Sequence, residues 1–168
     1  MAAKVEEVRG RQVVIRFDGR RCIHSRNCVL GRPDVFVPNV EGEWIHPDRA
    51  TPDEAAHLAL VCPSGAITYE RLDGGPHEAP PKVNTVRVRE NGPLALHAPH
   101  VVADQPPALR ATLCRCGASQ NKPWCDGSHR DRISGLIAAR HAPRHWSAAP
   151  RRGSAVATGL ECGAYSFN

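Results

Sequence analysis

The feature that most constrains this chain is a set of four metal-binding side chains between positions 114 and 129. Cys114, Cys116, Cys125 and His129 follow the pattern C-x-C-x8-C-x3-H. Residues two apart in an extended chain point to the same side, so the first two thiolates can bind one ion. Residues four apart share a helical face, so Cys125 and His129 can bind a second ion. Two ligand pairs suit two irons bridged by sulfide, and a single zinc ion with a Cys3His set is the alternative.

The residues between these ligands suit a compact metal loop. Gly117 and Gly127 allow close approach of the backbone, whose amide N–H groups can hydrogen-bond to anionic sulfur. We expect Asp126 to cap the turn that carries His129. We also expect Trp124 to shield the metal from water.

The segment CRCGASQNKPWCDGSH, residues 114–129, resembles the binding signature of the CDGSH iron–sulfur domain family (mitoNEET-like). The resemblance implies a 2Fe-2S cluster held by three thiolates and one imidazole, those of Cys114, Cys116, Cys125 and His129. The upstream GPLALHAPHVV is similar to the strand region that precedes the motif in bacterial members, whereas the sequence after Arg130 departs from the family. Some members form dimers by strand exchange, and the oligomeric state of this chain stays open.

A histidine ligand also shapes the expected redox chemistry. Neutral imidazole adds no negative charge, so it raises a cluster's potential relative to four cysteines. It can also take up a proton near neutral pH. We therefore expect proton-coupled redox behaviour and acid-lability at this cluster, and the variant His129→Cys tests both.

A second cysteine group lies in the N-terminal half. Cys22 and Cys28 belong to CIHSRNC, and Cys62 opens CPSGAI. The usual cubane-binding run is C-x2-C-x2-C with a remote Cys-Pro, and here Ser25 occupies the middle position. Residues 11–71 resemble the divergent single-cluster ferredoxin domain that accompanies CDGSH modules in bacteria.

The nuclearity of this second centre stays open. Three cysteines can bind a 3Fe-4S cluster fully, or a 4Fe-4S cluster whose last iron is held by water, Ser25 or His24. We favour 3Fe-4S slightly, because serine is a poor replacement for thiolate with soft metals. The alternative without metal is two loop cysteines and one buried core cysteine.

The expected fold class is α+β, with two small metal-stabilised domains: a ferredoxin-like N-terminal half and a β-rich CDGSH C-terminal half. The Pro- and Gly-rich linker 73–81 separates them. We expect one helix, from a Thr51–Glu54 capping box to near Cys62, because Pro63 disfavours helical geometry before it. The expected strands cover 13–17, 43–45, 66–70, 83–88, part of 93–102, and 109–114. The predicted domains are 11–72, a divergent mono-cluster ferredoxin-like domain; 82–133, a CDGSH iron–sulfur domain; and 134–168, a basic flexible tail with a short helix possible at 134–140.

Composition supports metal stabilisation. Aromatic residues make up 5% of the chain and the mean hydropathy is -0.40, so the apolar core is thin for 168 residues. No stretch approaches the roughly 20 apolar residues of a membrane span. We expect a soluble protein of the bacterial cytoplasm, where cysteines are thiols that bind metal rather than disulfides. Cys162 lies outside both groups and is expected to be a spare thiol.

The expected function is electron transfer, or redox or iron sensing, with a redox partner protein such as a reductase or electron acceptor. We expect no enzyme activity, since the sequence carries no P-loop, G-x-G-x-x-G or Ser-His-Asp signature. Storage of clusters and their delivery to apo-proteins is one alternative. A zinc-stabilised nucleic-acid-binding module is another, suggested by 6 Lys and Arg against 2 Asp and Glu, a net +4, in residues 130–168; nucleic acid remains the less favoured partner.

Overall fold

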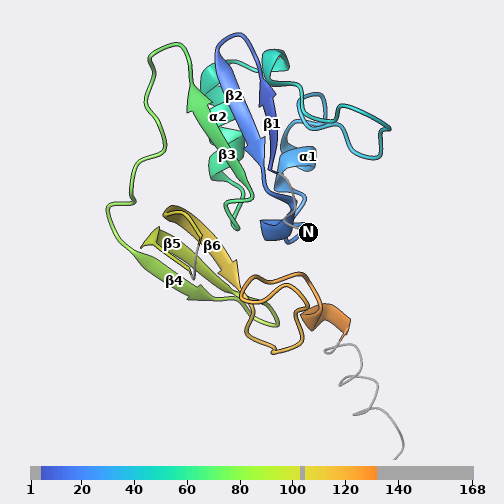
Figure 1. Cartoon of the computed structure of the whole chain (residues 1–168), viewed down its shortest axis with the longest axis vertical. Helices are drawn as coiled ribbons and strands as arrows, with labels where there is room; N and C mark the ends of the chain where they lie inside the picture. The colour runs from blue at the N-terminus through green and yellow to red at the C-terminus, as the bar shows by residue number, and fades with distance from the viewer. Residues whose placement is uncertain (1–4, 103–104, 132–168) are drawn as a thin grey trace, which may run out of the picture.

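The computed structural model describes residues 5–102 and 105–131, which form two small units with one antiparallel three-stranded sheet each. Figure 1 shows the sheets one above the other, with the linker after β3 running down one side to β4. The prediction of two small domains of mixed α and β structure is confirmed at this level. The N-terminal unit contains β1 (Glu6–Arg9), β2 (Val13–Phe17), η1 (Gly19–Arg21), α1 (Asn27–Gly31), η2 (Pro47–Arg49), α2 (Pro52–Leu60) and β3 (Ile67–Arg71), and the C-terminal unit contains β4 (Thr85–Val88), β5 (Leu94–His100) and β6 (Ala108–Leu113).

The first sheet is built around β2, which pairs with β1 on one side and β3 on the other. Its sequence VVIRF is β-branched and apolar, the composition that favours a half-buried pleated strand. Helix α2 packs on this sheet and closes the main hydrophobic core. The residues of this core are all buried, and they are Val13, Ile15, Val35, Phe36, Ile45, Ala55, Leu58, Ala59, Cys62, Ala66 and Ile67.

Helix α2 begins as the sequence predicts. The Glu54 N–H donates to Thr51 Oγ1 at 3.3 Å, and the Thr51 N–H donates to the Glu54 carboxylate at 2.9 Å, which completes the capping box. Pro52 is the first helical residue, where a missing N–H costs nothing. The helix ends at Leu60, so Cys62 lies just beyond its C-terminus.

One predicted strand is absent from the N-terminal unit, and two of its short elements were not predicted. The segment 43–45 forms no strand and makes only an isolated bridge between Phe36 and Ile45. Strand β1, with the polar sequence EEVR, was not expected; it forms because β2 offers it a partner, and Arg16 pairs with Glu7 at 2.6 Å across the two strands. The short helix α1, which carries Cys28, was not expected either.

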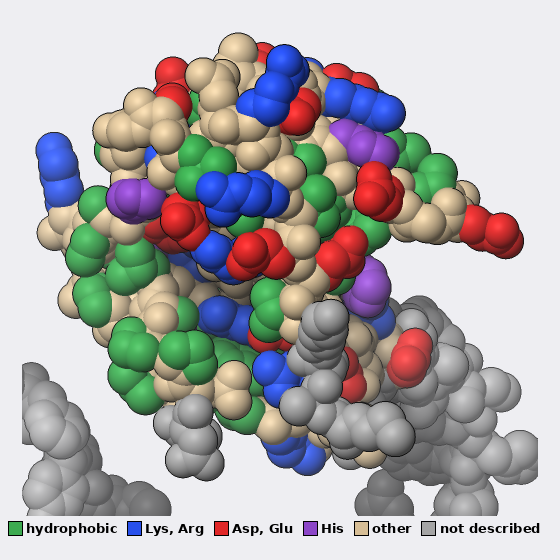
Figure 2. Space-filling model, turned by 45° about the horizontal axis from the view of Figure 1, so that its top comes forward, with side chains coloured by type: hydrophobic (Ala, Val, Ile, Leu, Met, Phe, Trp, Pro, Cys, Tyr) green, Lys and Arg blue, Asp and Glu red, His purple; other side chains and the backbone are tan. Residues whose placement is uncertain are grey.

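The second sheet has little core of its own. Among the described residues after position 72, the buried hydrophobic side chains are Ala111, Trp124 and Cys125. The strand predicted at 83–88 is present as β4 (Thr85–Val88), but the prediction that it is half-buried is wrong, because β4 is an edge strand on which Val86 and Val88 are 65% and 64% exposed. Figure 2 shows hydrophobic side chains at the surface on the lower left, where this sheet lies, and mixed acidic and basic side chains over the N-terminal unit. The C-terminal unit therefore needs stabilisation from outside its own apolar packing.

Several predictions fall outside the described residues: the helix at 134–140, the tail to 168, the last two positions of the predicted domain 82–133, and Cys162. In the part of the chain that the structure describes, no helix has the length and apolar character that crossing a membrane requires. The six cysteines of that part form no disulfide with one another.

Candidate metal centres

Strand β6 delivers the first cysteines of the C-terminal loop. Its last residue, Leu113, forms an isolated antiparallel bridge with Trp124, so the returning loop lies beside the strand end. The Cys114 N–H donates to the Pro123 carbonyl at 2.8 Å, and the Cys125 N–H donates to the Thr112 carbonyl at 3.0 Å. These backbone bonds hold Cys114 and Cys125 next to one another although eleven positions separate them in sequence.

The side chains of this loop stand as two pairs. Cys114 Sγ and Cys116 Sγ are 3.8 Å apart, and Cys125 Sγ lies 3.4 Å from His129 Nδ1. Tetrahedral binding to one metal, at ~2.3 Å from sulfur and ~2.05 Å from nitrogen, places two sulfurs ~3.8 Å apart and a sulfur–nitrogen pair ~3.5 Å apart. Each pair is therefore already at the spacing that a single ion needs.

Asp126 and two glycines shape the turns between the ligands. Asp126 accepts from the Ser128 hydroxyl at 2.7 Å and from the Ser128 N–H at 3.0 Å, which confirms the predicted cap, and from the Gln120 N–H at 2.8 Å. These donors hold the pKa of the Asp126 carboxyl well below its usual range. Gly117 and Gly127 have φ of 74° and 92°, a region that side chains disfavour. The Ala118 N–H donates to Cys116 Sγ at 3.4 Å, the amide-to-sulfur contact that the glycines were expected to allow.

The thiols of this loop differ in acidity. At Cys114, burial raises the pKa, but hydrogen bonds from the backbone of Ser119 and Gly117 and from the Cys116 side chain outweigh it, and the pKa falls below its usual value. At Cys125, burial raises the pKa, and the nearby charges of Asp126, Cys114 and Cys116 add to the increase. The two pairs are close enough for their thiolates to repel one another. A bound cation would remove that repulsion.

The three cysteines of the N-terminal unit line one cavity of about 540 Å³. Ser25 and His24 also line this cavity. Cofactor sites commonly measure ~300–1,000 Å³. Cys22 follows η1, Cys28 lies in α1, and Cys62 follows α2, so three separate elements meet here. The structure thus brings together the three residues that the sequence grouped, together with both candidates for a fourth ligand.

The loop that carries Ser25 has an unusual backbone. His24 and Arg26, on either side of it, have φ of 53° and 64°, in the left-handed region that non-glycine residues rarely adopt. Such strain concentrates at functional sites. The His24 N–H donates to Cys22 Sγ at 3.4 Å, and at the opposite wall Ser64 Oγ lies 3.6 Å from Cys62 Sγ. Both sulfurs therefore have polar contacts of the kind that stabilise a thiolate.

Electrostatics also mark the three cysteines as neighbours. Burial raises the pKa of the Cys22 thiol, and the charge of Cys62 raises it further, while the His24 N–H partly opposes the increase. Burial likewise raises the pKa of the Cys28 thiol, with contributions from Cys62 and Cys22. Because cysteine binds metal as the thiolate, metal binding here would release protons from these thiols.

A second cavity, of about 310 Å³, is lined by Ile23 and Ser25 from the N-terminal unit and by His129 from the C-terminal loop. Ile23 and Ser25 also line the three-cysteine cavity, so they form a shared wall. Within the described residues, no three His, Cys, Asp or Glu side chains gather around a single point.

Residues that sequence reasoning missed join the two units. Arg110 of β6, 4% exposed, reaches into the N-terminal unit, and Arg21, beside Cys22, stacks over the Trp124 ring at 4.9 Å from its centroid. Burial lowers the pKa of Arg21, and the nearby charge of Asp18 offsets part of this decrease. The Trp124 ring therefore contacts an arginine of the other unit, besides any role as a shield. An arginine between apolar strand residues, in ALRATL, was the available signal for such a contact.

Comparison with known families assigns both halves. Residues 8–72 match a family model described as a divergent 4Fe-4S mono-cluster domain, and residues 73–130 match one described as an iron-binding zinc finger of CDGSH type. Comparisons with curated proteins and with solved structures gave no match. Together with the cysteine sites, the matches define an iron–sulfur cluster-binding protein. Its residues 8–72 belong to the divergent 4Fe-4S mono-cluster family and its residues 73–130 to the CDGSH family, as the sequence motifs indicated.

Proposed function

We propose that this protein carries electrons, or reports redox or iron state, through a 2Fe-2S cluster in the C-terminal unit and a second cluster in the N-terminal unit. The observation that carries the proposal is the spacing of the two ligand pairs, 3.8 Å for Cys114 with Cys116 and 3.4 Å for Cys125 with His129. When bound, such clusters supply one-electron chemistry. The surrounding residues bind them, limit water access and set their potential.

A 2Fe-2S cluster suits the C-terminal loop because each iron needs two protein donors. The loop presents its donors in pairs held side by side by the backbone bonds of Cys114 and Cys125. A zinc ion is the competing occupant, since a Cys3His set is an ordinary zinc ligand set. Iron and acid-labile sulfide in the purified protein support the cluster, and stoichiometric zinc without sulfide contradicts it.

A 4Fe-4S cluster suits the N-terminal cavity, in agreement with the description of the family that residues 8–72 match. In such a cluster each cysteine binds a different iron, so Cys22, Cys28 and Cys62 need to line one cavity rather than surround one point. The last iron falls to Ser25, to His24 or to water. Because oxygen donors suit soft iron–sulfur irons poorly, loss of this iron on oxidation would leave the 3Fe-4S form.

The decisive experiment is spectroscopy of anaerobically purified protein. We expect 6 irons and 6 sulfides per chain, the sum of about 2 and about 4 of each, with two distinct EPR signals after reduction. Two variant chains, one with Cys114 and Cys116 replaced by Ala and one with Cys22 and Cys28 replaced by Ala, should each keep a single signal. Retention of both signals in either chain contradicts the ligand assignment.

Electron exchange with a separate redox protein, without catalysis by this chain, completes the proposal. No substrate pocket is required for it, because electrons pass between centres that approach closely. Cluster delivery to apo-proteins is a second candidate, favoured by the half-buried His129 beside a cavity. Incubation with an apo-ferredoxin separates the two: cluster transfer without net oxidation supports delivery, and stable retention during repeated reduction supports electron transfer.

A further inference from the structure

The contact between the two units is built from arginines that lie beside the candidate ligands of both centres. Arg110, from the C-terminal unit, donates from Nη1 to the Cys62 carbonyl at 2.6 Å and to the Ala59 carbonyl, and from Nη2 to the Ile67 carbonyl at 3.1 Å. These carbonyls lie at the end of α2 and the start of β3. One side chain therefore holds both ends of the segment that carries Cys62.

The linker supplies the counter-charge. Glu78 accepts from Arg110 Nε at 2.6 Å and from Nη2 at 2.8 Å, and the two side chains are only 14% and 4% exposed. A buried arginine is tolerated when its charge and its donors are satisfied. Arg110 has a carboxylate and three backbone acceptors, so it is a fully built contact rather than an accidental one.

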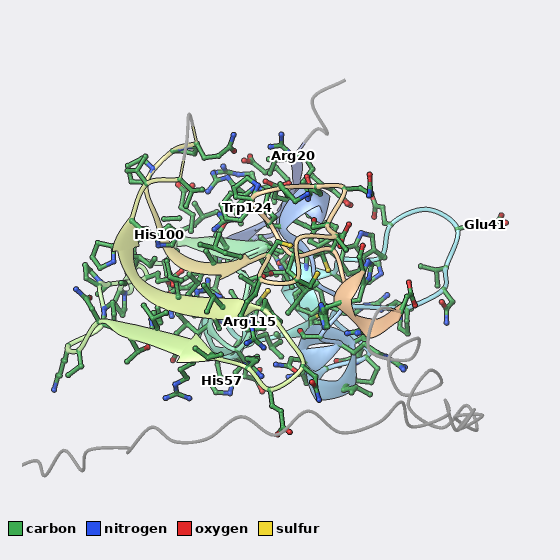
Figure 3. All side chains as sticks on the ribbon, turned by 90° about the horizontal axis from the view of Figure 1, so that it is seen from below. Arg20, Glu41, His57, His100, Arg115 and Trp124 are labelled. Carbon is green, nitrogen blue, oxygen red and sulfur yellow. The ribbon has the colours of Figure 1, made fainter. Side chains whose placement is uncertain are left out.

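The N-terminal unit returns the contact through the residues that precede Cys22. Arg21 Nη2 donates to the Arg110 carbonyl at 2.5 Å, and its guanidinium lies over the Trp124 ring, next to Cys125. Asn121 of the C-terminal loop donates to the Arg20 carbonyl at 2.5 Å. Figure 3 labels Arg20 and Trp124, which belong to the two segments that these contacts join.

The backbones of the two units also touch at Gly65. A Cβ at this position would lie 2.7 Å from the Arg110 carbonyl oxygen, and the φ of Gly65 is +64°. Only glycine permits both this approach and this conformation. Gly65 belongs to the CPSGAI segment, three residues after Cys62.

We propose that Arg21 and Arg110 form a clamp that couples the two metal centres, so that filling either centre orders the cysteine segment of the other. The proposal rests on the metal sites proposed above. Order imposed at one centre can reach the other by two routes. Arg21 directly precedes Cys22 and contacts Trp124, the residue before Cys125. Arg110 binds the Cys62 carbonyl and lies on β6, the strand that leads to Cys114. Sites that share an ordering cost bind cooperatively.

Amide hydrogen exchange of the peptide 61–67, measured by mass spectrometry, tests the clamp. The full chain is compared with a chain whose C-terminal centre is emptied by Cys114→Ala and Cys116→Ala. We expect exchange at 61–67 to become roughly 5- to 150-fold faster when the distant centre is emptied, the range of typical coupling constants. The reciprocal change, Cys22→Ala with Cys28→Ala, should accelerate exchange at 110–116 by a similar factor.

The clamp is then removed in both backgrounds by Arg21→Met, and separately by Arg110→Met. With either change, emptying one centre should alter exchange at the other by less than about twofold, within the scatter of independent sites. Arg71→Met is the matched control, because Arg71 is an arginine with a 7% exposed side chain and two carboxylate partners inside the N-terminal unit. It should leave the coupling intact. Arg21→Met keeps the test available if Arg110→Met prevents folding.

Equal exchange at 61–67 in the full and emptied chains overturns the clamp. Coupling that survives Arg21→Met in a folded chain overturns it as well. Metal analysis of the same samples separates this result from the proposed function. A chain that holds zinc and no sulfide refutes the iron–sulfur assignment, and the exchange ratio between its filled and emptied forms still decides the coupling.

Discussion

Replacing Arg110 by Met should be one of the most destabilising single substitutions in this chain. It removes the three hydrogen bonds that Arg110 donates to the carbonyls of Ala59, Cys62 and Ile67. It also leaves Glu78, 14% exposed, without its cation. Breaking a buried ion pair by deleting one partner costs ~3–5 kcal/mol.

That cost is large against the ~5–15 kcal/mol that stabilises a typical domain. With a urea m-value of ~2 kcal/mol/M, it corresponds to a midpoint shift of about 2 M. We expect this shift in urea unfolding of the holo-protein followed by far-UV circular dichroism. The matched control Arg71→Met should shift the midpoint less, because its partners Asp53 and Asp73 are 87% and 21% exposed, against 14% for Glu78.

A double variant isolates the pair. Glu78→Leu added to Arg110→Met removes the buried charge that the single change leaves behind, so it should recover part of the lost stability. A midpoint change below about 0.5 M for Arg110→Met, which at the same m-value is ~1 kcal/mol, would refute the reasoning. Absence of any recovery in the double variant would show that the Glu78 charge is not what makes the single change costly.

The remaining predictions concern the two centres and the helix that leads to one of them. Gly65→Ala should lower the free energy of unfolding by ~1–3 kcal/mol, because a Cβ would lie 2.7 Å from the Arg110 carbonyl oxygen and φ is +64°; an unchanged urea midpoint contradicts this. Ser25→Cys should protect the N-terminal cluster from iron loss on air oxidation, read as a smaller 3Fe-4S EPR signal than in the unaltered chain; equal signals count against a role for position 25. His129→Cys should lower the potential of the C-terminal cluster by on the order of 100 mV, since a thiolate adds negative charge; an unchanged potential in redox titrations would contradict this. Thr51→Ala should destabilise by ~1 kcal/mol through loss of the helix cap, and a match to the unaltered chain in thermal unfolding would argue that the cap is redundant.

Local rules predicted the elements whose signals are local. The capping box at Thr51, the Pro63 stop and the apolar run of β2 each act within a few residues, and the structure has α2 and β2 where these signals place them. The two ligand pairs also follow from spacing alone, because residues two or four apart are held together by the chain itself. Their measured separations agree with that expectation.

Strand β1 was missed and the burial of strand β4 was predicted wrongly, because both depend on contacts with distant parts of the chain. Strand β1 has the composition EEVR and exists because β2 pairs with it. Strand β4 has the alternation of a half-buried strand, yet nothing in the described residues covers Val86 and Val88. Alternation reports which face a side chain is on, but only the tertiary structure decides whether that face is covered.

Residue types and their spacing predicted which residues could bind metal, how they divide between the two halves and which families those halves resemble. These properties depend on residue type and short spacing, which tertiary contacts cannot alter. Only the tertiary structure brought Cys22 and Cys28 to the same cavity as Cys62, and placed Arg110 of one unit against the carbonyl of Cys62 in the other. Residues so far apart in sequence come together only through the packing of the whole chain, and the contact of Arg110 spans 48 positions. The small core of the C-terminal unit makes this contact with the N-terminal unit important for stability.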